Sequence, residues 1–485
     1  MTGQSRIVAV GGYAPRFRID ADEFADAWGR FEASAIREKA LANADEDALT
    51  LACEAAARTL SAAGVSGEEV DLLVFATTTP PLEESDLTAR LGAMVGVPKD
   101  VTRHSFGNST RAGTRALVAT LDALGESQVG LVVAADCPEG APDAERDHAA
   151  GAGAAALLLA GNDVEFGGDG TAGAEIVARA EHAVPYPGTR FRRRGGKEIE
   201  SLAVRSYERA AFTEPLAAAV ENLDVDPESV DAAAVQAPDG ALAYRVGAVL
   251  GVDNETIQAA ATVHELGDTG AASVPLGIAR ALANGHGTVL AAGWGGGVGA
   301  DALLIERRGE IDADLALGDG EAVSYPAYLR RRGAITSGPP AGGGAYVSVP
   351  SWRRTLPQRY RLVAGRCSAC ATLAFPPEGA CSDCGVLGEY EDIELPGTGT
   401  VEAVTTISQG GAPPEFAEQQ AKSGDFGVAV VALDGPGDET VSVPAQVVDG
   451  HDLAVDDRVE ATVRRIYTQE GITRYGFKIR PVGGS

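Results

Sequence analysis

The sequence predicts an α/β domain built from two similar halves, followed by two small domains at the C-terminus. Three observations support this expectation. Apolar strand-like runs alternate with helical runs, and their order occurs twice between residues 47 and 306. Four cysteines are then spaced C-x2-C-x10-C-x2-C, and five short strand-like runs follow them. The predicted fold class is therefore α/β, a duplicated domain layered α-β-α-β-α, with a cysteine-rich ribbon and a small all-β barrel after it.

The duplication is visible in the order of its segments. VDLLVFATTTPP, from Val70, precedes LGAMVGV and the helical run TRAGTRALVATLDALG. VDAAAVQAPDG, from Val230, precedes RVGAVLGV and GDTGAASVPLGIARALANG. Each copy follows an alanine-rich helical run and precedes two apolar runs, at 129–135 and 153–160 and again at 288–292 and 299–306. Continuous apolar runs of this length indicate strands that are buried on both faces.

Composition restricts the function classes. The formal charge is −29 and the sequence pI is near 4.6, which argues against a nucleic-acid partner, because such proteins present basic surfaces. Five lysines among so many acidic residues are typical of proteins from a salt-rich cytoplasm, where screening relieves self-repulsion. The longest apolar stretch, 151–161, is too short to span a membrane. A halophilic, cytoplasmic protein is expected.

The first 350 residues resemble the thiolase superfamily, and within it hydroxymethylglutaryl-CoA synthases of the archaeal kind. The resemblance is carried, in order, by IVAVGGYAPRFRID, ADEDALTLACEAA, FGNSTRAGTRAL, GAGAAALLLAG, LGDTGAASVPLG and GWGGGVGADALLI. It implies a thiolase fold with its N-terminal half at 1–165 and its C-terminal half, with the following segment, at 166–336. It also implies acyl-CoA as the ligand and a homodimer as the assembly.

The positions that match the family's catalytic residues carry other residues here. The resemblance places Thr110, preceded by Ser109, at the acylated cysteine and Thr78 at the glutamate base. It places Gln236 at the histidine and Asp268 at an asparagine. An alkyl hydroxyl is a poor nucleophile without a base, so these changes predict a thiolase fold that no longer acylates itself.

Other side chains offer alternative chemistry. Cys53 and Cys137 are either nucleophiles or small buried apolar residues. His104 and His264 lie near the turns before the two central helices, and His264 with Glu265 is a candidate acid/base pair as well as an ordinary turn sequence. Tyr207 and Tyr244 are possible acids in a cysteine-independent cleavage, or simply packed tyrosines.

One basic cluster interrupts the acidic sequence. It lies in YPGTRFRRRGGKE and comprises Arg190, Arg192, Arg193, Arg194 and Lys197. In the resembling synthases this stretch lies near the CoA entrance, and grouped arginines suit a phosphorylated nucleotide. The alternative is a solvated loop whose cations pair with neighbouring acidic residues.

The C-terminal region predicts a metal site. After a linker at 337–350, residues 351–390 are expected to form a helix and a zinc ribbon. Two C-x2-C pairs can complete a closed tetrahedral site for structural zinc, with free thiols or redox disulfides as alternatives, and the candidate ligands are Cys367, Cys370, Cys381 and Cys384. Residues 391–485 contain five strand-like runs that fit an OB-type barrel. This region resembles the acyl-CoA-associated zinc-ribbon/OB-fold family, whose members accompany thiolase-fold enzymes.

Three functions remain open from the sequence. The favoured one is a non-acylating acyl-CoA-binding or scaffold partner of a thiolase or synthase. The second is a cysteine-independent acyl-CoA aldolase or lyase that uses Tyr207 and Tyr244. The third is an acyltransferase that carries out a synthase-type condensation through a noncanonical residue.

Overall fold

The computed structural model describes residues 5–165, 172–202, 204–223, 226–336, 348–408, 414–469 and 471–483. The chain divides into two compact units. Unit 1 comprises residues 1–42, 47–92 and 96–328, and unit 2 comprises residues 43–46, 93–95 and 329–485. Most of the predicted linker at 337–350 lies outside the described residues. None of the helices within the described ranges is both long and apolar enough to cross a bilayer.

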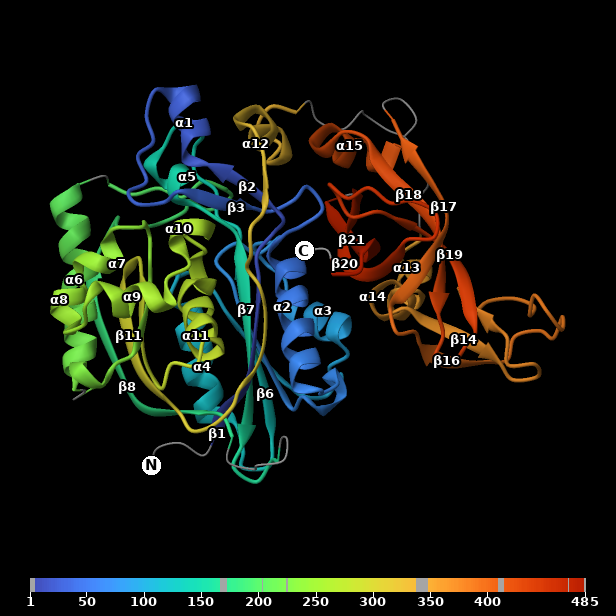
Figure 1. The fold of residues 1–485 in the computed structure, drawn as a ribbon, viewed down its shortest axis with the longest axis horizontal. Coiled ribbons are helices and arrows are strands. Elements are labelled where there is room, and N and C mark those ends of the chain that lie inside the picture. Colours follow the sequence, from blue (N-terminus) through green and yellow to red (C-terminus); the bar gives the residue numbers. More distant parts are fainter. Residues whose placement is uncertain are drawn as a thin grey trace. The chain divides into compact units, whose positions relative to one another are not determined.

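Unit 1 is built on a mixed β-sheet with two related halves (Figure 1). The strand order is β5-β4-β6-β7-β1-β8-β11-β10-β9, and β12 pairs in parallel with β1. β7 and β11 each run antiparallel to both of their neighbours, whereas β5, β4 and β6 are parallel, as are β9 and β10. The strands are β1 (Ser5–Tyr13), β4 (Leu72–Ala76), β5 (Thr102–Phe106), β6 (Val129–Asp136), β7 (Gly153–Gly161), β8 (Ala174–Tyr186), β9 (Ala232–Val235), β10 (Thr288–Gly295), β11 (Gly297–Arg307) and β12 (Asp312–Ala316).

Four helices complete the five predicted layers. α2 (Ala48–Ala63) and α6 (Arg205–Glu221) cover the outer faces, and α4 (Ala112–Ala123) and α11 (Ser273–Ala283) lie between the two halves of the sheet (Figure 1). The order β1-α2-β4-α4-β6-β7 therefore recurs as β8-α6-β9-α11-β10-β11. The shorter helices are α1 (Ala21–Trp28), α3 (Leu87–Val95), α5 (Glu145–Ala149), α7 (Leu242–Arg245), α8 (Gly247–Leu250), α9 (Asn254–Ala260), α10 (Val263–Leu266) and α12 (Tyr325–Arg331).

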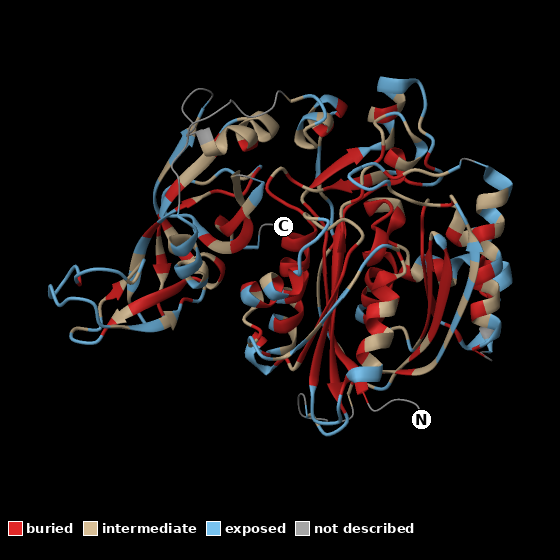
Figure 2. Cartoon of the chain, turned by 180° about the vertical axis from the view of Figure 1, so that it is seen from behind, coloured by how far each residue is buried: buried red, intermediate tan, exposed pale blue. Residues whose placement is uncertain are grey.

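Burial explains why the strand-like runs were visible in the sequence. Every residue of β1, β4, β6 and β7 is buried, because helices cover both faces of the sheet (Figure 2). Small residues let the central helices approach closely. A Cβ at Gly113, in the first turn of α4, would lie 2.2 Å from the carbonyl oxygen of Ala271, just before α11. The strands predicted at 129–135, 153–160, 288–292 and 299–306 are confirmed as β6, β7, β10 and β11.

The two halves differ at their edges. In the first half β5 is the edge strand, and most of its residues are exposed. No strand among the described residues of the second half corresponds to β5. There the edge strand β9 is fully buried, and α9 packs against it. The duplicated domain therefore has one open sheet edge and one covered edge.

A buried polar cluster lies beside a small sheet formed by β2 (Phe17–Asp20), β3 (Glu38–Leu41) and β13 (Glu321–Ala322). Lys39 of β3 is 2% exposed, and its Nζ donates to the Tyr328 hydroxyl at 2.9 Å. That hydroxyl donates in turn to Asp147 Oδ2 at 2.8 Å. The ammonium also lies 4.8 Å and 4.7 Å from the ring centroids of Phe24 and Tyr328. The cation is thus held by a carboxylate network and by aromatic faces.

His148 adjoins this cluster and is held neutral. Its side chain is fully buried and stacks on Phe31, with ring centroids 5.3 Å apart. The Glu32 backbone N–H donates to Nδ1 at 3.0 Å, and Nε2 has no partner among the described residues. Burial lowers the pKa of His148, and the nearby charge of Lys39 lowers it further.

The stability of the chain should therefore fall below neutral pH because of His148. Its pKa in the folded chain lies below the ordinary value of 6.5, so the unfolded chain takes up this proton first. The contribution of the neutral imidazole is complete above pH 6.5 and is lost as the pH falls toward the folded pKa. We expect His148→Asn, which keeps an acceptor for Glu32, to flatten the pH dependence of the unfolding free energy, by at most about 1.4 kcal/mol per pH unit.

Denaturant titrations from pH 7.5 to 5 in molar KCl measure this pH dependence. His286→Asn, at a half-exposed turn, is the matched control, and equal slopes for wild type and His148→Asn would contradict the assignment.

From residue 348 onward, unit 2 begins with two short helices and continues with a ribbon and a barrel. The helices are α13 (Val349–Arg354) and α14 (Leu356–Arg361), and the ribbon sheet has the order β15-β14-β16. The barrel has the order β19-β18-β17-β20-β21, and the bridge between Val447 and Ile479 brings its two ends together. The five strands predicted for this region are all present. The remaining elements are β14 (Val363–Cys367), β15 (Leu373–Ala374), β16 (Tyr390–Glu394), β17 (Thr398–Ile407), α15 (Ala417–Ser423), β18 (Phe426–Asp434), β19 (Thr440–Gln446), β20 (Arg458–Gln469) and β21 (Ile472–Pro481).

Candidate functional site

The candidate site in unit 1 is organised by the buried carboxylate of Asp136, at the C-terminal end of β6. Its Oδ1 accepts from the hydroxyls of Thr77 and Thr79 at 2.9 and 3.0 Å and from the backbone N–H groups of Thr78 and Thr79 at 2.6 and 2.9 Å. Its Oδ2 accepts from the Thr78 hydroxyl at 2.7 Å and from the Ala271 N–H at 2.6 Å. A carboxylate offers about four lone-pair sites, so this one is saturated. It fixes the loop after β4 to the start of α11.

Two more of the predicted residues, Asp268 and Gln236, form hydrogen bonds with the backbone of Gly270. Asp268 Oδ1 accepts from the Gly270 N–H at 3.0 Å, and Gln236 Nε2 donates to the Gly270 carbonyl oxygen at 3.0 Å. Gly270 has φ +55°, and a Cβ there would lie 2.1 Å from Asp136 Oδ2. Only glycine fits this position without displacing the carboxylate. Thr78, Gln236 and Asp268 are therefore brought together around one residue.

Thr110 and Ser109 lie on the turn that leads into α4. The Thr110 hydroxyl donates to the carbonyl oxygen of Trp294, in β10, at 2.6 Å. Ser109 Oγ has no partner among the described residues and packs against Gly295, where a Cβ would lie 1.8 Å from it. The contact between Gly113 and Ala271 holds this helix start beside Gly270. All five predicted positions thus surround the start of α11, although no side-chain contact joins Thr110 to Thr78, Gln236 or Asp268.

Arg111, the N-cap residue of α4, forms a mostly buried ion pair that sequence reasoning missed. Arg111 Nε donates to Asp301 Oδ2 at 2.9 Å, and the Thr114 hydroxyl donates to the same oxygen at 2.7 Å. Burial opposes the charge of Arg111, but its hydrogen bond and charge pairing with Asp301 raise its pKa overall. Asp301 is 2% exposed, so the helix start is locked by its charge partner in β11.

The two isolated cysteines lie in α2 and directly after β6, and both are mostly buried. Cys53 is buried in α2. Cys137 follows Asp136, and its Sγ lies 3.8 Å from the Thr79 hydroxyl. Burial, reinforced by the negative charge of Asp47, raises the pKa of Cys137 far above its ordinary value, so that this residue is a neutral thiol.

Two of the other candidate residues, Tyr244 and His264, contact each other in the structure. Tyr244 and His264 form a hydrogen-bonded pair, with the Tyr244 oxygen 2.7 Å from His264 Nε2. His264 Nδ1 lies 2.5 Å from the Ala35 carbonyl oxygen. A carbonyl only accepts, so Nδ1 carries the proton. The single Tyr244 hydroxyl proton has two acceptors within reach, His264 Nε2 and Gln258 Oε1 at 2.6 Å. Burial raises the pKa of Tyr244, and Glu265 adds to the effect.

The remaining candidates have other partners. Glu265 pairs with Arg37 at 3.3 Å and Arg280 at 3.0 Å rather than with His264. The Tyr207 hydroxyl donates to the Pro187 carbonyl oxygen at 3.1 Å, and its ring packs against Tyr186. His104 is exposed on β5.

The basic cluster divides into inward and outward residues. Arg190 pairs with Asp268 and Arg192 donates to the Thr78 carbonyl oxygen, so both reach the residues around Gly270. Arg193 pairs with Glu200 at 2.8 Å. Arg194 and Lys197 are exposed. Only part of the cluster is therefore available to a phosphorylated ligand at the surface.

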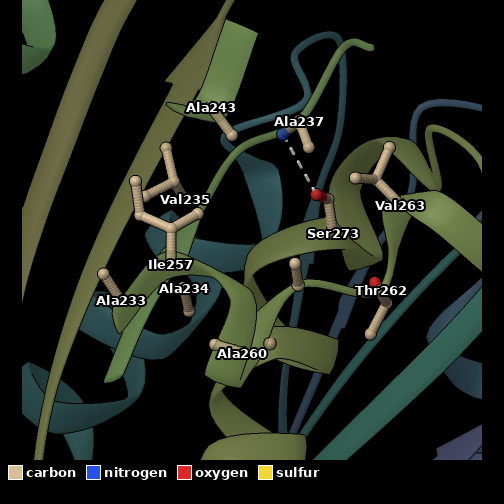
Figure 3. Close-up of a pocket in the computed structure, with 12 residues that line it drawn as sticks. Ala233, Ala234, Val235, Ala237, Ala243, Ile257, Ala260, Thr262, Val263 and Ser273 are labelled. Carbon is tan, nitrogen blue, oxygen red and sulfur yellow. Dashed lines mark hydrogen bonds between the residues drawn. The ribbon is translucent and has the colours of Figure 1, made fainter. Parts of the chain in front are cut away.

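A small cavity beside α11 is too narrow for an acyl group. It measures about 10 Å3 and is lined mainly by alanine and valine side chains between β9 and the start of α11 (Figure 3). The Ala237 N–H donates to the Ser273 hydroxyl across it at 3.4 Å. A space of this size holds at most one water molecule.

The four ribbon cysteines converge in unit 2. Their Sγ atoms all lie within 4.8 Å of one another, with Cys367 and Cys384 3.7 Å apart and Cys370 and Cys381 3.5 Å apart. The Thr372 hydroxyl lies 3.3 Å from Cys370 Sγ, and hydrogen bonding by Thr372 lowers the pKa of Cys370 to about 6. Four thiols so placed can bind a metal ion as thiolates.

Comparison with known proteins agrees with this architecture. Residues 354–389 match the family model of the ChsH2 rubredoxin-like zinc ribbon domain, and residues 392–464 match the ChsH2 C-terminal OB-fold domain. The chain is 29% identical over 323 residues to a hydroxymethylglutaryl-CoA synthase of Methanopyrus kandleri, covering 63% of this chain and 89% of that protein. It is 28% identical over 338 residues to the corresponding synthase of Methanosarcina mazei, covering 67% of this chain and 95% of that protein.

Solved structures show the same fold at lower identity. The structure of MvaS in complex with 3-hydroxy-3-methylglutaryl coenzyme A matches with TM-score 0.59 and 18% identity, over 71% of this chain and 95% of that chain. An HMG-CoA synthase complexed with CoA matches with TM-score 0.60 and 15% identity, over 71% and 94%. The 3-oxoacyl-(acyl carrier protein) synthase III of Pseudomonas aeruginosa matches with TM-score 0.53 and 20% identity, over 64% and 99%. The chain thus has a thiolase-like α/β fold, a zinc ribbon domain and an OB-fold.

Proposed function

We propose that this chain binds acyl-CoA thioesters in unit 1 without becoming acylated, and acts as a partner of a thiolase or synthase. The hydrogen bond of Thr110 carries the proposal. Its hydroxyl proton is held by the Trp294 carbonyl oxygen at 2.6 Å, and a carbonyl does not remove a proton as a base would. The Asp136 carboxylate, which accepts many hydrogen bonds in this region, is already saturated by threonine hydroxyls and backbone N–H groups.

Two observations support CoA as the ligand. Structures with the same fold include complexes with CoA and with 3-hydroxy-3-methylglutaryl coenzyme A. Arg194 and Lys197 are exposed on a loop whose other arginines reach the residues around Gly270. Cations placed there suit the phosphates of a nucleotide whose acyl end points to the interior.

Incubation with acetyl-CoA or acetoacetyl-CoA in molar KCl should leave the mass of the intact protein unchanged. The reason is that the Thr110 hydroxyl donates to a backbone carbonyl and Ser109 Oγ has no partner among the described residues, so neither hydroxyl is bonded to a base. Thr110→Cys tests whether a thiol at this position is acylated when no base is provided. A thiol without a base or a charged partner should acylate at most slowly. A stoichiometric acyl adduct on the wild-type protein, mapped to Ser109, Thr110 or Cys137, would contradict the proposal and favour the condensing acyltransferase.

The Tyr244–His264 pair favours a second candidate function, a cysteine-independent aldolase or lyase. A histidine oriented by a backbone carbonyl and bonded to tyrosine can exchange a proton with a substrate hydroxyl. The same incubations, repeated with 3-hydroxy-3-methylglutaryl-CoA, test this function by the release of acetyl-CoA. Cleavage that Tyr244→Phe abolishes and Tyr207→Phe retains would support it, and absence of cleavage would leave the binding role.

We also propose that the four ribbon cysteines hold structural zinc. A tetrahedron with Zn–S bonds of about 2.3 Å places sulfurs about 3.8 Å apart. The observed separations of 3.5 and 3.7 Å fit that geometry. Four sulfur ligands would leave no open position for a substrate, so the ion would stabilise the ribbon.

Elemental analysis should find one zinc ion per chain. Cys381→Ser should lose the ion and make the segment between Cys367 and Cys384 sensitive to protease, because the ribbon has little apolar core of its own. Cys53→Ala, which removes a buried thiol from α2, is the control and should keep the zinc. Full metal-free protection of the ribbon would overturn the structural role.

We further propose a homodimer in a salt-rich cytoplasm, formed through the open edge of β5. An exposed edge strand with one pairing partner invites a second copy. Light scattering in molar KCl should give two chains per particle, and His104→Lys should shift the protein toward monomer because like charges would meet across the twofold axis. His182→Lys, on β8, should remain dimeric. A monomeric wild type would refute the assembly.

A further inference from the structure

Arg190 is the cation that reaches furthest into the candidate site. Its backbone, which follows β8, packs against the turn between β10 and β11. A Cβ at Gly296, in that turn, would lie 2.3 Å from the Arg190 carbonyl oxygen. The preceding Thr189 hydroxyl accepts from the Gly297 N–H at 3.1 Å. The Arg190 side chain is only 8% exposed, and its Nη1 donates to Asp268 Oδ2. Both ends of the side chain are therefore held.

One terminal nitrogen of this guanidinium makes no hydrogen bond to the described residues. Arg190 Nη2 is buried and has no partner among the described residues. Arginine stays charged, and a buried charged donor left without an acceptor is costly. The structure therefore places a strong donor where a ligand or a water molecule would relieve that cost. The other nitrogen, Nη1, cannot serve because Asp268 occupies it.

The surrounding charges favour a neutral acceptor. Asp268 already balances the charge of Arg190, and Asp136 contacts the same glycine, Gly270, from the other side. A second carboxylate would meet these two anions, whereas a carbonyl oxygen would not. A hydrogen bond from a charged guanidinium to a carbonyl oxygen is also stronger than one from a neutral donor.

Three more buried polar atoms of the candidate site have no partner among the described residues. Gln236 Oε1 and Thr269 Oγ1 belong to residues that are 1% and 0% exposed, and both residues neighbour Gly270 in space or in sequence. Ser109 Oγ faces Gly295, next to the glycine that contacts the Arg190 backbone. These atoms add one acceptor and two hydroxyls to the polar groups of the residues near Gly270 and Gly295.

We propose that Arg190 Nη2 binds the carbonyl oxygen of the acyl thioester. This inference rests on the proposed function, since it assigns the acyl end of the bound CoA thioester to the interior. Arg190 would then hold the thioester by its carbonyl oxygen. The Thr110 hydroxyl, before α4, is already bonded to the Trp294 carbonyl oxygen. The pairing with Asp268 orients the guanidinium for that contact.

The test compares acetyl-CoA with S-ethyl-CoA, which has a methylene in place of the carbonyl. Calorimetric titration of the full chain in molar KCl should show acetyl-CoA binding about ten- to hundredfold more tightly, as one hydrogen bond to a charged group provides. Arg190→Gln should abolish this preference. Arg194→Gln, on the exposed part of the same loop, should change both affinities equally and keep the preference.

The outcomes separate the inference from the proposed function. If neither ligand binds the wild-type protein, the proposed function fails. If both bind and Arg190→Gln keeps the preference, the carbonyl contact is wrong and the acyl-CoA role stands. Should Arg190→Gln not fold, acetyl-CoA labelled with 13C at the carbonyl decides the matter on the wild type. A downfield shift on binding supports a charged donor, and an unshifted resonance overturns it.

Discussion

The close contact between α4 and the start of α11 is the constraint on which the candidate site depends. Gly113 has no side chain, so the first turn of α4 lies directly against the Ala271 carbonyl oxygen and Pro275, and Gly270 likewise leaves room for the Asp136 carboxylate. Asp136 then reaches across to Ala271 and fixes the threonine loop after β4. Burying a carboxylate is costly, but its many hydrogen bonds offset the lost hydration. The outcome is a rigid polar centre inside an alanine-rich core.

Much of the fold could be predicted because its strands are covered on both faces. β6 and β7 appear in the sequence as unbroken apolar runs for that reason, and the repeated order of runs predicted the layers. The four ribbon cysteines were visible by spacing alone. The barrel strands could be counted in advance, but the bridge between Val447 and Ile479 that brings the barrel ends together depends on packing and could not.

The candidate site was predictable only in part. The resemblance located Thr78, Thr110, Gln236 and Asp268, and the structure gathers them around Gly270 without a side-chain contact from Thr110 to the other three. It did not reveal Asp136, although an aspartate ending the apolar run VVAAD was a signal. The arginine cluster resembled one surface patch in the sequence. Its division into inward and outward residues follows from which acidic groups the fold brings near, which no local pattern records.

The Thr110–Trp294 hydrogen bond also has an evolutionary consequence. Under the proposed function, a descendant of this chain could not acquire acylation chemistry by changing one codon, because a cysteine at 110 would stand beside Thr78 and Gln236 rather than beside a carboxylate and an imidazole. Asp136 bonds to Thr78 and Arg190 pairs with Asp268, so changing either of these two residues would first disturb the packing around Gly270. The lineage would have to pass through less stable intermediates. Under the proposed function, these coupled contacts would keep the chain to binding rather than to covalent catalysis.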